Sequence, residues 1–171
     1  HDTARIDQKD LQLRLKLDNE TIQIPAKGSF TLPKDESVIL PFNFLMEDAL
    51  LKYATAQLLM KIDDNGKEHY FFFTPDGMNT EYVFDKATVR GKNQFAPVPG
   101  LKSTFSIRTK AGKEVKITTL TREQALNSCK IDGKLLITEA TVLPGSGEVQ
   151  LLSLGNNRFE YVLYPSKQGF K

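Results

Sequence analysis

The strongest constraint on the fold is a series of short segments in which apolar and polar residues alternate. In residues 11–17 four leucines alternate with polar residues, and residues 21–24 repeat the pattern after Asp18-Asn19. A period of two places successive side chains on opposite faces of a β-strand. The Asp-Asn pair between the two segments is typical of a tight turn. The sequence therefore predicts a β-hairpin over residues 11–24.

Further strand signals follow in the first half of the chain. Apolar segments separated by Pro, Gly, Asp and Asn predict strands at residues 28–33, 38–44, 50–62, 68–74 and 81–89. Pro41 cannot donate a hydrogen bond to a neighbouring strand, so its strand is expected at a sheet edge or with a bulge. The aromatic run in residues 70–73 indicates a strand buried on both faces. Residues 49–62 also consist of good helix formers, so a helix is the alternative there, but the strand signals on both sides favour one long strand. We expect the last three segments to form a meander.

The second half adds strands and one helix signal. Residues 104–108 and 114–118 flank Ala111-Gly112 and predict a hairpin, and further strands are expected at 134–137, 139–143, 147–153 and 158–164. Thr121 followed by Gln124 forms a capping box, which predicts a short helix near residues 121–128. Strands at intervals of about 8–12 residues are typical of a sandwich or barrel. The sequence thus predicts an all-β fold, an antiparallel β-sandwich with one short helix.

Charge and breaker residues suggest where the chain divides. Residues 1–90 carry 11 basic and 15 acidic residues, a net charge of −4, whereas residues 91–171 carry 12 and 6, a net charge of +6. The segment 91–100 between them is rich in Gly and Pro and is expected to be a linker or long loop. The prediction is a β subdomain over 1–90 and a second, with the short helix, over 101–171. The alternative is one continuous β domain.

Length and composition exclude several classes of protein. The 171 residues are too few for a complete (β/α)₈ barrel, which needs roughly 200–250 residues. Hydrophobic residues make up 40% and charged residues 26%, as in globular proteins, and no apolar run is long enough to span a bilayer. Cys129 is the single cysteine, so an intrachain disulfide cannot form. The chain begins at His1 without Met or a signal-peptide pattern, and we interpret it as a piece of a longer protein.

Candidate catalytic and metal-binding residues are few. No G-x-S-x-G motif is present, and His69 is predicted to be a strand-end surface or packing residue. Cys129 is expected to be a buried small hydrophobe. Asp63-Asp64-Asn65-Gly66 resembles half of an EF-hand loop, but Thr74 stands at the twelfth position, so a tight turn is predicted. Residues 144–147 likewise predict a turn rather than a phosphate loop. We therefore predict no catalytic residue, no metal and no cofactor.

Binding signals are also weak. The lysines of the second half are scattered singly, which favours a solvated surface or a contact with the acidic first half or a neighbouring domain over nucleic acid. These are Lys102, Lys110, Lys113, Lys116, Lys130 and Lys134. Trp is absent, so stacking on sugar rings would depend on tyrosines, each inside a predicted strand where core packing is the default. These are Tyr53, Tyr82, Tyr161 and Tyr164. Asn19-Glu20-Thr21 fits an N-glycosylation sequon.

Several segments, taken in order, resemble a known family. They are TIQIPAKGSFTL at 21–32, VILP at 38–41, LKYATAQLL at 51–59, YFFFTPDG at 70–77 and EYVF at 81–84, followed by ITTLTREQA at 117–125. Their order and spacing are similar to the non-catalytic β-domain that follows the barrel in glycoside hydrolase family 35 β-galactosidases. The resemblance covers about residues 20–137.

The resemblance implies an accessory role. In that family the two catalytic glutamates lie on a TIM barrel, and nothing in this chain matches the barrel, so no catalytic residue carries over. The expectation is a non-catalytic scaffold module of a secreted or periplasmic hydrolase, with the barrel of the same parent chain as its partner. A galactoside-type carbohydrate is a further candidate partner. The alternatives are a stand-alone carbohydrate-binding module, which predicts exposed coplanar tyrosines, and a structural partner-binding β domain.

Overall fold

The protein is built almost entirely from β-strands. The computed structural model describes residues 6–17, 20–144, 149–152 and 160–165. Strands and tight turns dominate this part of the chain, and its one α-helix is α1 (Arg122–Leu126). Within these residues no helix is long and apolar enough to cross a membrane. The predicted all-β class with one short helix is confirmed.

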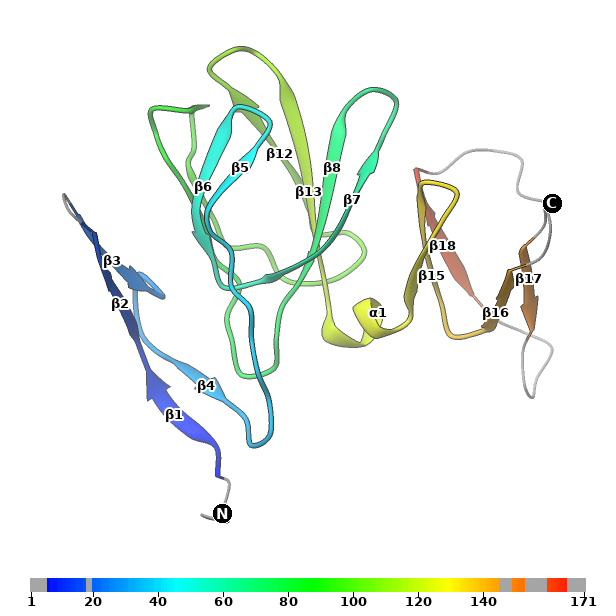
Figure 1. The fold of residues 1–171 in the computed structure, drawn as a ribbon, viewed down its shortest axis with the longest axis horizontal. Coiled ribbons are helices and arrows are strands. Elements are labelled where there is room, and N and C mark those ends of the chain that lie inside the picture. Colours follow the sequence, from blue (N-terminus) through cyan, green and yellow to red (C-terminus); the bar gives the residue numbers. More distant parts are fainter. Residues whose placement is uncertain (1–5, 18–19, 145–148, 153–159, 166–171) are drawn as a thin grey trace.

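Two sheets form the central sandwich (Figure 1). One has five strands in the order β10 (Val89–Arg90), β12 (Thr104–Thr109), β13 (Glu114–Leu120), β8 (Glu68–Phe73) and β7 (Gln57–Asp63). The other has four, in the order β11 (Gln94–Phe95), β9 (Tyr82–Phe84), β6 (Ala49–Ala54) and β5 (Phe42–Met46). Neighbouring strands run antiparallel except for β8 and β13, which are parallel.

Smaller sheets flank the sandwich. On one side lie two pairs, β1 (Gln8–Leu11) with β4 (Phe30–Leu32), and β2 (Leu13–Lys16) with β3 (Thr21–Ile24). Beyond α1 lie the sheet β14 (Ser128–Ile131), β15 (Lys134–Thr138) and β18 (Tyr161–Tyr164), and the pair β16 (Thr141–Pro144) with β17 (Val149–Leu152). The β2–β3 pair confirms the predicted N-terminal hairpin.

The core explains why the aromatic strand β8 is central. Tyr70 and Phe72 point into the cluster between the two sheets, which also contains Tyr82, Phe84 and Ile117. Phe71 lies on the opposite face and packs in a second cluster with Leu120, Leu135 and Ile137. Alternation along the strand therefore buries aromatic rings on both faces, as the sequence predicted.

Residues 50–62 do not form one long strand. The chain bends at Thr55-Ala56, so that β6 belongs to the four-stranded sheet and β7 to the five-stranded one. The buried Thr55 hydroxyl donates to the carbonyl of Asn79 (2.6 Å) and accepts from the amide of Glu81 (2.7 Å). These bonds hold a corner at which the chain crosses from one sheet to the other.

The predicted meander is also wrong in part. β7 and β8 pair as a hairpin through the turn at residues 63–66, but β9 pairs with β6 and β11 rather than with β8. The place beside β8 is taken by β13 from the second half of the chain. Pro41 precedes β5, which is an edge strand, as expected from the missing donor.

The helix begins where the capping box predicts. The side chain of Thr121 accepts from the amide of Gln124 (3.1 Å), and the side chain of Gln124 accepts from the amide of Thr121 (3.1 Å). The helix ends at Leu126, and the next residues form β14, a strand that the sequence pattern did not indicate. The predicted hairpin of β12 and β13 is confirmed. The predicted turn at 144–147 falls largely outside the described residues.

Residues 91–100 lie between strands that share one sheet. β7 and β8 precede this segment and β12 and β13 follow it, and all four are neighbours in the five-stranded sheet. Within the segment β11 pairs with β9, and the amide of Gly100 donates to the carbonyl of Thr119 (2.8 Å). The division of the chain into folding units at this segment stays a prediction.

Candidate functional site

A cleft lies where α1 meets the sheet of β15 and β18. It encloses about 890 Å³. Its apolar lining comes from Leu101, Ile137 and Val162, which belong to or pack against the second hydrophobic cluster. Its remaining lining residues are polar or aromatic: Glu123, Gln124, Asn127, Thr138, Glu139, Glu160 and Tyr161. A cleft with apolar lining and a few converging polar groups is the usual form of a small-molecule site.

Backbone contacts tie the three walls of the cleft together. The amide of Thr138 donates to the carbonyl of Asn127 (2.9 Å), which joins β15 to the end of α1. The hydroxyl of Thr138 donates to the carbonyl of Glu160 (3.0 Å), which joins β15 to the start of β18. The cleft is therefore formed by the fold itself rather than by side chains that must move together.

Acidic groups surround the cleft. Glu123, Glu139 and Glu160 are exposed, and none of them forms an ion pair with another described residue. Carboxylates at this position favour ligands that donate hydrogen bonds or carry positive charge.

The four candidate tyrosines fall into different environments. Tyr53 and Tyr82 are buried, and Tyr82 bonds Thr119 through its hydroxyl (2.7 Å). Tyr164 is half-buried and its hydroxyl donates to the carbonyl of Leu101 (3.0 Å). Tyr161 is 47% exposed and lines the cleft. Core packing is therefore the right interpretation for the first two, and one tyrosine remains for contact with a ligand.

A smaller cavity of about 300 Å³ lies beside the β2–β3 hairpin. Among its lining residues are Ala26 and Glu81, and the amide of Ala26 donates to the Glu81 carboxylate (3.0 Å). Close to them the Tyr53 hydroxyl is buried without a hydrogen-bond partner among the described residues. Burial raises the pKa of the Tyr53 phenol, and the negative charge of Glu81 raises it further, so the phenol stays protonated.

His69 is a packing residue and not a surface residue. Its Nε2 lies 2.7 Å from the Thr118 hydroxyl, its ring stacks on Phe71 with centroids 4.1 Å apart, and only 3% of it is exposed. Burial lowers the pKa of the imidazole from 6.5 to about 4; the Asp64 carboxylate opposes this shift and Lys116 adds to it. The ring is therefore neutral at pH 7.

Cys129 is half-exposed on β14 instead of fully buried as predicted. Burial of the thiol raises its pKa, which reduces the thiolate fraction at neutral pH. Residues 63–66 form the predicted turn, in which the Asp63 carboxylate accepts from the amide of Gly66 (2.7 Å) and Asp64 pairs with Lys116 (2.6 Å). In the described part of the chain no three His, Cys, Asp or Glu side chains gather to hold a metal ion.

Comparison with protein families identifies the chain. The family model of β-galactosidase, domain 2, matches residues 1–140 of the 171. The chain belongs to this family. None of the curated proteins compared with it matches it. The predicted resemblance to a non-catalytic β-galactosidase domain is thus confirmed at that level, while glycoside hydrolase family 35 stays a prediction.

The domain 2 match ends at residue 140, so it contains only part of the residues that line the cleft. The match contains the central sandwich, α1, β14 and β15, whereas β16, β17 and β18 lie beyond residue 140. Glu123 and Glu139 therefore belong to the matched part, and Glu160 and Tyr161 do not. No sequence pattern indicated this cleft, because its walls come from residues 101, 123–127, 137–139 and 160–162, which only tertiary packing brings together.

Proposed function

We propose that this β-galactosidase domain 2 is a scaffold module of a family 35 glycoside hydrolase that packs against the catalytic barrel of the same parent protein. The match over residues 1–140 is the observation that carries the proposal. In this role the module supplies no catalytic group and supports the barrel. We also propose a secreted or periplasmic location, which fractionation of cells that express the parent protein will test.

Exposed apolar side chains support a docking role. Ile39, Val98 and Leu126 are 82%, 85% and 71% exposed, so they add almost nothing to the stability of the domain's own core. The centre of a stable protein–protein interface is apolar and depleted of charge. These three residues are therefore the first positions to test as contacts with a catalytic domain.

The experiment measures both activity and association. The 171-residue chain is expected to leave a chromogenic galactoside intact and to bind a separately produced barrel domain of its parent in isothermal titration calorimetry. The triple variant Ile39→Asp, Val98→Asp, Leu126→Asp is expected to weaken that binding at least about tenfold, or about 1.4 kcal/mol. Hydrolysis of the galactoside by the isolated chain would overturn the non-catalytic role.

A matched control separates loss of contact from added charge. Ala87, Ala96 and Ala111 are also exposed, and Ala→Asp changes at these positions add the same three negative charges. The control variant is expected to bind the barrel as the wild type does. Equal weakening by both triple variants would show that the apolar residues are not the contacts.

A carbohydrate-binding module is the second candidate, and Tyr161 is the observation that favours it. Its exposed ring beside carboxylates and amides offers an apolar face together with acceptors for sugar hydroxyls. Titration with galactose-based oligosaccharides is expected to show binding that Tyr161→Ala abolishes and Tyr164→Phe retains. Absence of binding by the wild-type chain would remove this candidate and leave the scaffold role untouched.

A further inference from the structure

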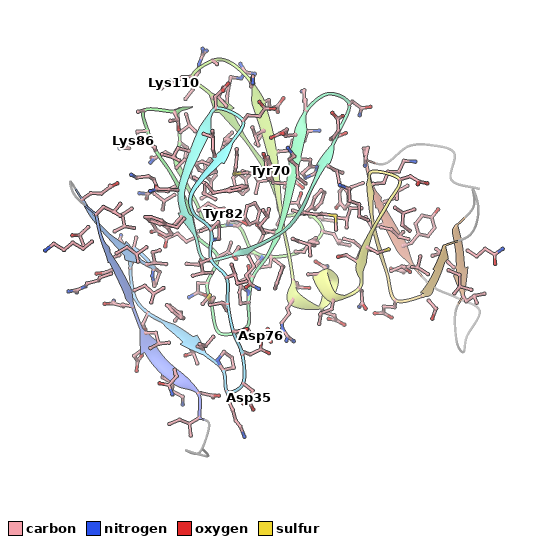
Figure 2. All side chains as sticks on the ribbon, in the orientation of Figure 1. Asp35, Tyr70, Asp76, Tyr82, Lys86 and Lys110 are labelled. Carbon is pink, nitrogen blue, oxygen red and sulfur yellow. The ribbon has the colours of Figure 1, made fainter. Side chains whose placement is uncertain are left out.

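Five cationic side chains gather at one edge of the five-stranded sheet. They come from two stretches of the chain, residues 86–92, which contain β10 and the turns on either side of it, and residues 108–110, which contain the end of β12 and the start of the turn after it. Figure 2 labels Lys86 and Lys110 on loops at the same end of the sandwich. We call this set the basic edge; it consists of Lys86, Arg90, Lys92, Arg108 and Lys110, all exposed.

Two arginines of the basic edge stand directly opposite each other. Arg90 of β10 and Arg108 of β12 are register partners in an antiparallel pair. Like charges in this position destabilise a sheet, because the two side chains lie on the same face at close range. The Arg90 guanidinium donates to the carbonyl of Lys110 (2.6 Å), which orients it but does not neutralise it.

Four of the described acidic groups lie at this end, and no ion pair joins any of them to the basic edge; Asp85, beside Lys86, accepts from the amide of Ala87 (2.8 Å). Lys113 pairs with Glu47 (2.6 Å) and Asp48 (3.3 Å). Glu114, which stands opposite Arg108 on β13, pairs with Lys67 (2.6 Å). Among the described residues none forms an ion pair with a member of the basic edge. Its five cations therefore have no ion-pair partner within this part of the molecule.

The composition of the edge indicates the kind of ligand. None of the large hydrophobic side chains found exposed in the described residues lies within 86–92 or 108–110, so the edge lacks the apolar centre of a protein–protein interface. It also lacks the exposed aromatic rings on which single-stranded nucleic acids stack. Edge strands often carry a charge that blocks strand pairing, but that purpose does not require two opposed arginines.

We propose that the basic edge binds a linear polysaccharide that carries carboxylates, with Arg90 and Arg108 each pairing with a uronate group. Guanidinium groups bind carboxylates through two parallel hydrogen bonds. Carboxylates repeated along a chain would match cations spread over residues 86–92 and 108–110. The choice of a polysaccharide as the polymer rests on the proposed function as a glycosidase module, whereas binding to the edge does not require docking to a barrel.

The test uses the complete 171-residue chain and polygalacturonate. Calorimetry at low ionic strength is expected to show binding that weakens steeply as salt rises from about 0.02 M to about 0.2 M. The variant K86Q/R90Q/K92Q/R108Q/K110Q is expected to bind at least tenfold more weakly. Its thermal midpoint is expected to equal or exceed that of the wild type, because a like-charge pair is removed.

A second variant removes the same charge elsewhere. K16Q/K27Q/K34Q/K102Q/K130Q changes five exposed lysines outside the edge and is expected to stay within threefold of the wild-type affinity. Equal loss in both variants would overturn the proposal, since net charge alone would then explain binding. So would absence of wild-type binding, or equally tight binding of duplex DNA or polyglutamate. Association of the edge variant with the barrel domain, measured in parallel, separates a failure of this proposal from a failure of the scaffold role.

Discussion

Among single residues, His69 couples the stability of the fold to pH. The pKa of its imidazole is about 4 in the folded chain because it is buried, against about 6.5 when unfolded. Between these values the unfolded state binds the proton more tightly, so acidification favours unfolding. The stabilisation is complete above pH 6.5 and is lost as pH falls towards 4, up to about 3 kcal/mol in all.

The change His69→Gln tests this assignment. The slope of the free energy of unfolding against pH between about 4.5 and 6.5 is expected to flatten in the variant. Asp64 and Glu114 are among the carboxylates whose pKa is lowered, through bonds with Lys116 and Lys67, and the stability that they provide is lost only as the pH falls below this range. Urea titrations of both proteins at several pH values give the slopes. An unchanged slope in the variant would assign the pH dependence to another group.

Gly77 is the glycine whose missing side chain matters most. Its φ is +78°, and a Cβ placed there would overlap the backbone oxygen of Thr31 and lie 3.1 Å from its carbonyl carbon. The two backbones are close because the amide of Thr31 donates to the carbonyl of Gly77 (3.0 Å). This contact fastens β4 to the turn that follows β8.

The change Gly77→Ala is therefore expected to lower the free energy of unfolding by more than the penalty for the left-handed backbone conformation alone. Gly66 has a similar φ of +79° with no atom within 4 Å of its would-be Cβ, so Gly66→Ala isolates the conformational penalty, about 1–2 kcal/mol. Gly77→Ala is expected to lose about 2–4 kcal/mol, because backbone must also shift. Chemical denaturation of the two variants gives the difference, and equal losses would contradict the close approach.

Among the elements, the corner between β6 and β7 decides how the two sheets are connected. Thr55 is 1% exposed, and its hydroxyl donates to the Asn79 carbonyl and accepts from the Glu81 amide. Thr55→Val keeps the shape but removes the hydroxyl partner of both partly buried backbone groups, which is expected to cost about 2–3 kcal/mol.

Serine at the same position provides the comparison. Thr55→Ser keeps the hydroxyl and removes one methyl group, so it is expected to cost about 1 kcal/mol. Guanidinium-induced unfolding followed by circular dichroism measures both variants. A serine variant as unstable as the valine variant would show that packing, rather than hydrogen bonding, holds the corner.

The same corner shows which features of the fold the sequence could predict and which it could not. Local signals were sufficient for the hairpins β2–β3, β7–β8 and β12–β13 and for the start of α1, since turn residues and the capping box act within a few positions. Period-two patterning, however, runs through Thr55 without a Gly, Pro, Asn or Asp to mark a bend. The bend there depends on Asn79 and Glu81, more than 20 residues away.

For the same reason, local sequence patterns could not predict which distant strands pair with each other. The parallel contact of β8 with β13 joins residues 69–73 to residues 116–120, and no local pattern specifies that register. The candidate sites share this property, since the cleft draws on four segments of the chain and the basic edge on residues 86–92 and 108–110. The lysines and arginines of the edge look scattered along the sequence and become a cluster only when β10 pairs with β12.

In the molecule as a whole, the contacts of the segment 91–100 indicate whether the chain unfolds in one step or in two. Phe95 of β11 stacks on Phe105 with ring centroids 4.4 Å apart and meets Phe84 at 6.2 Å. Phe105 belongs to β12 and Phe84 to β9, so this ring joins strands from both sides of the segment. The core between the sheets likewise contains side chains from residues 46 to 117. We therefore expect both halves to unfold together.

Limited proteolysis tests this expectation directly. Under native conditions a protease of broad specificity is expected to spare residues 91–100, because β11 is paired and Gly100 is bonded to Thr119. The heat-unfolded chain, cleaved within the same segment, is the control. A fragment of residues 1–90 made alone is expected to lack a cooperative thermal transition, since its β8 loses the neighbour β13 and exposes Tyr70 and Phe72. Rapid native cleavage at 91–100 into two fragments that stay folded would instead establish two subdomains with a linker between them.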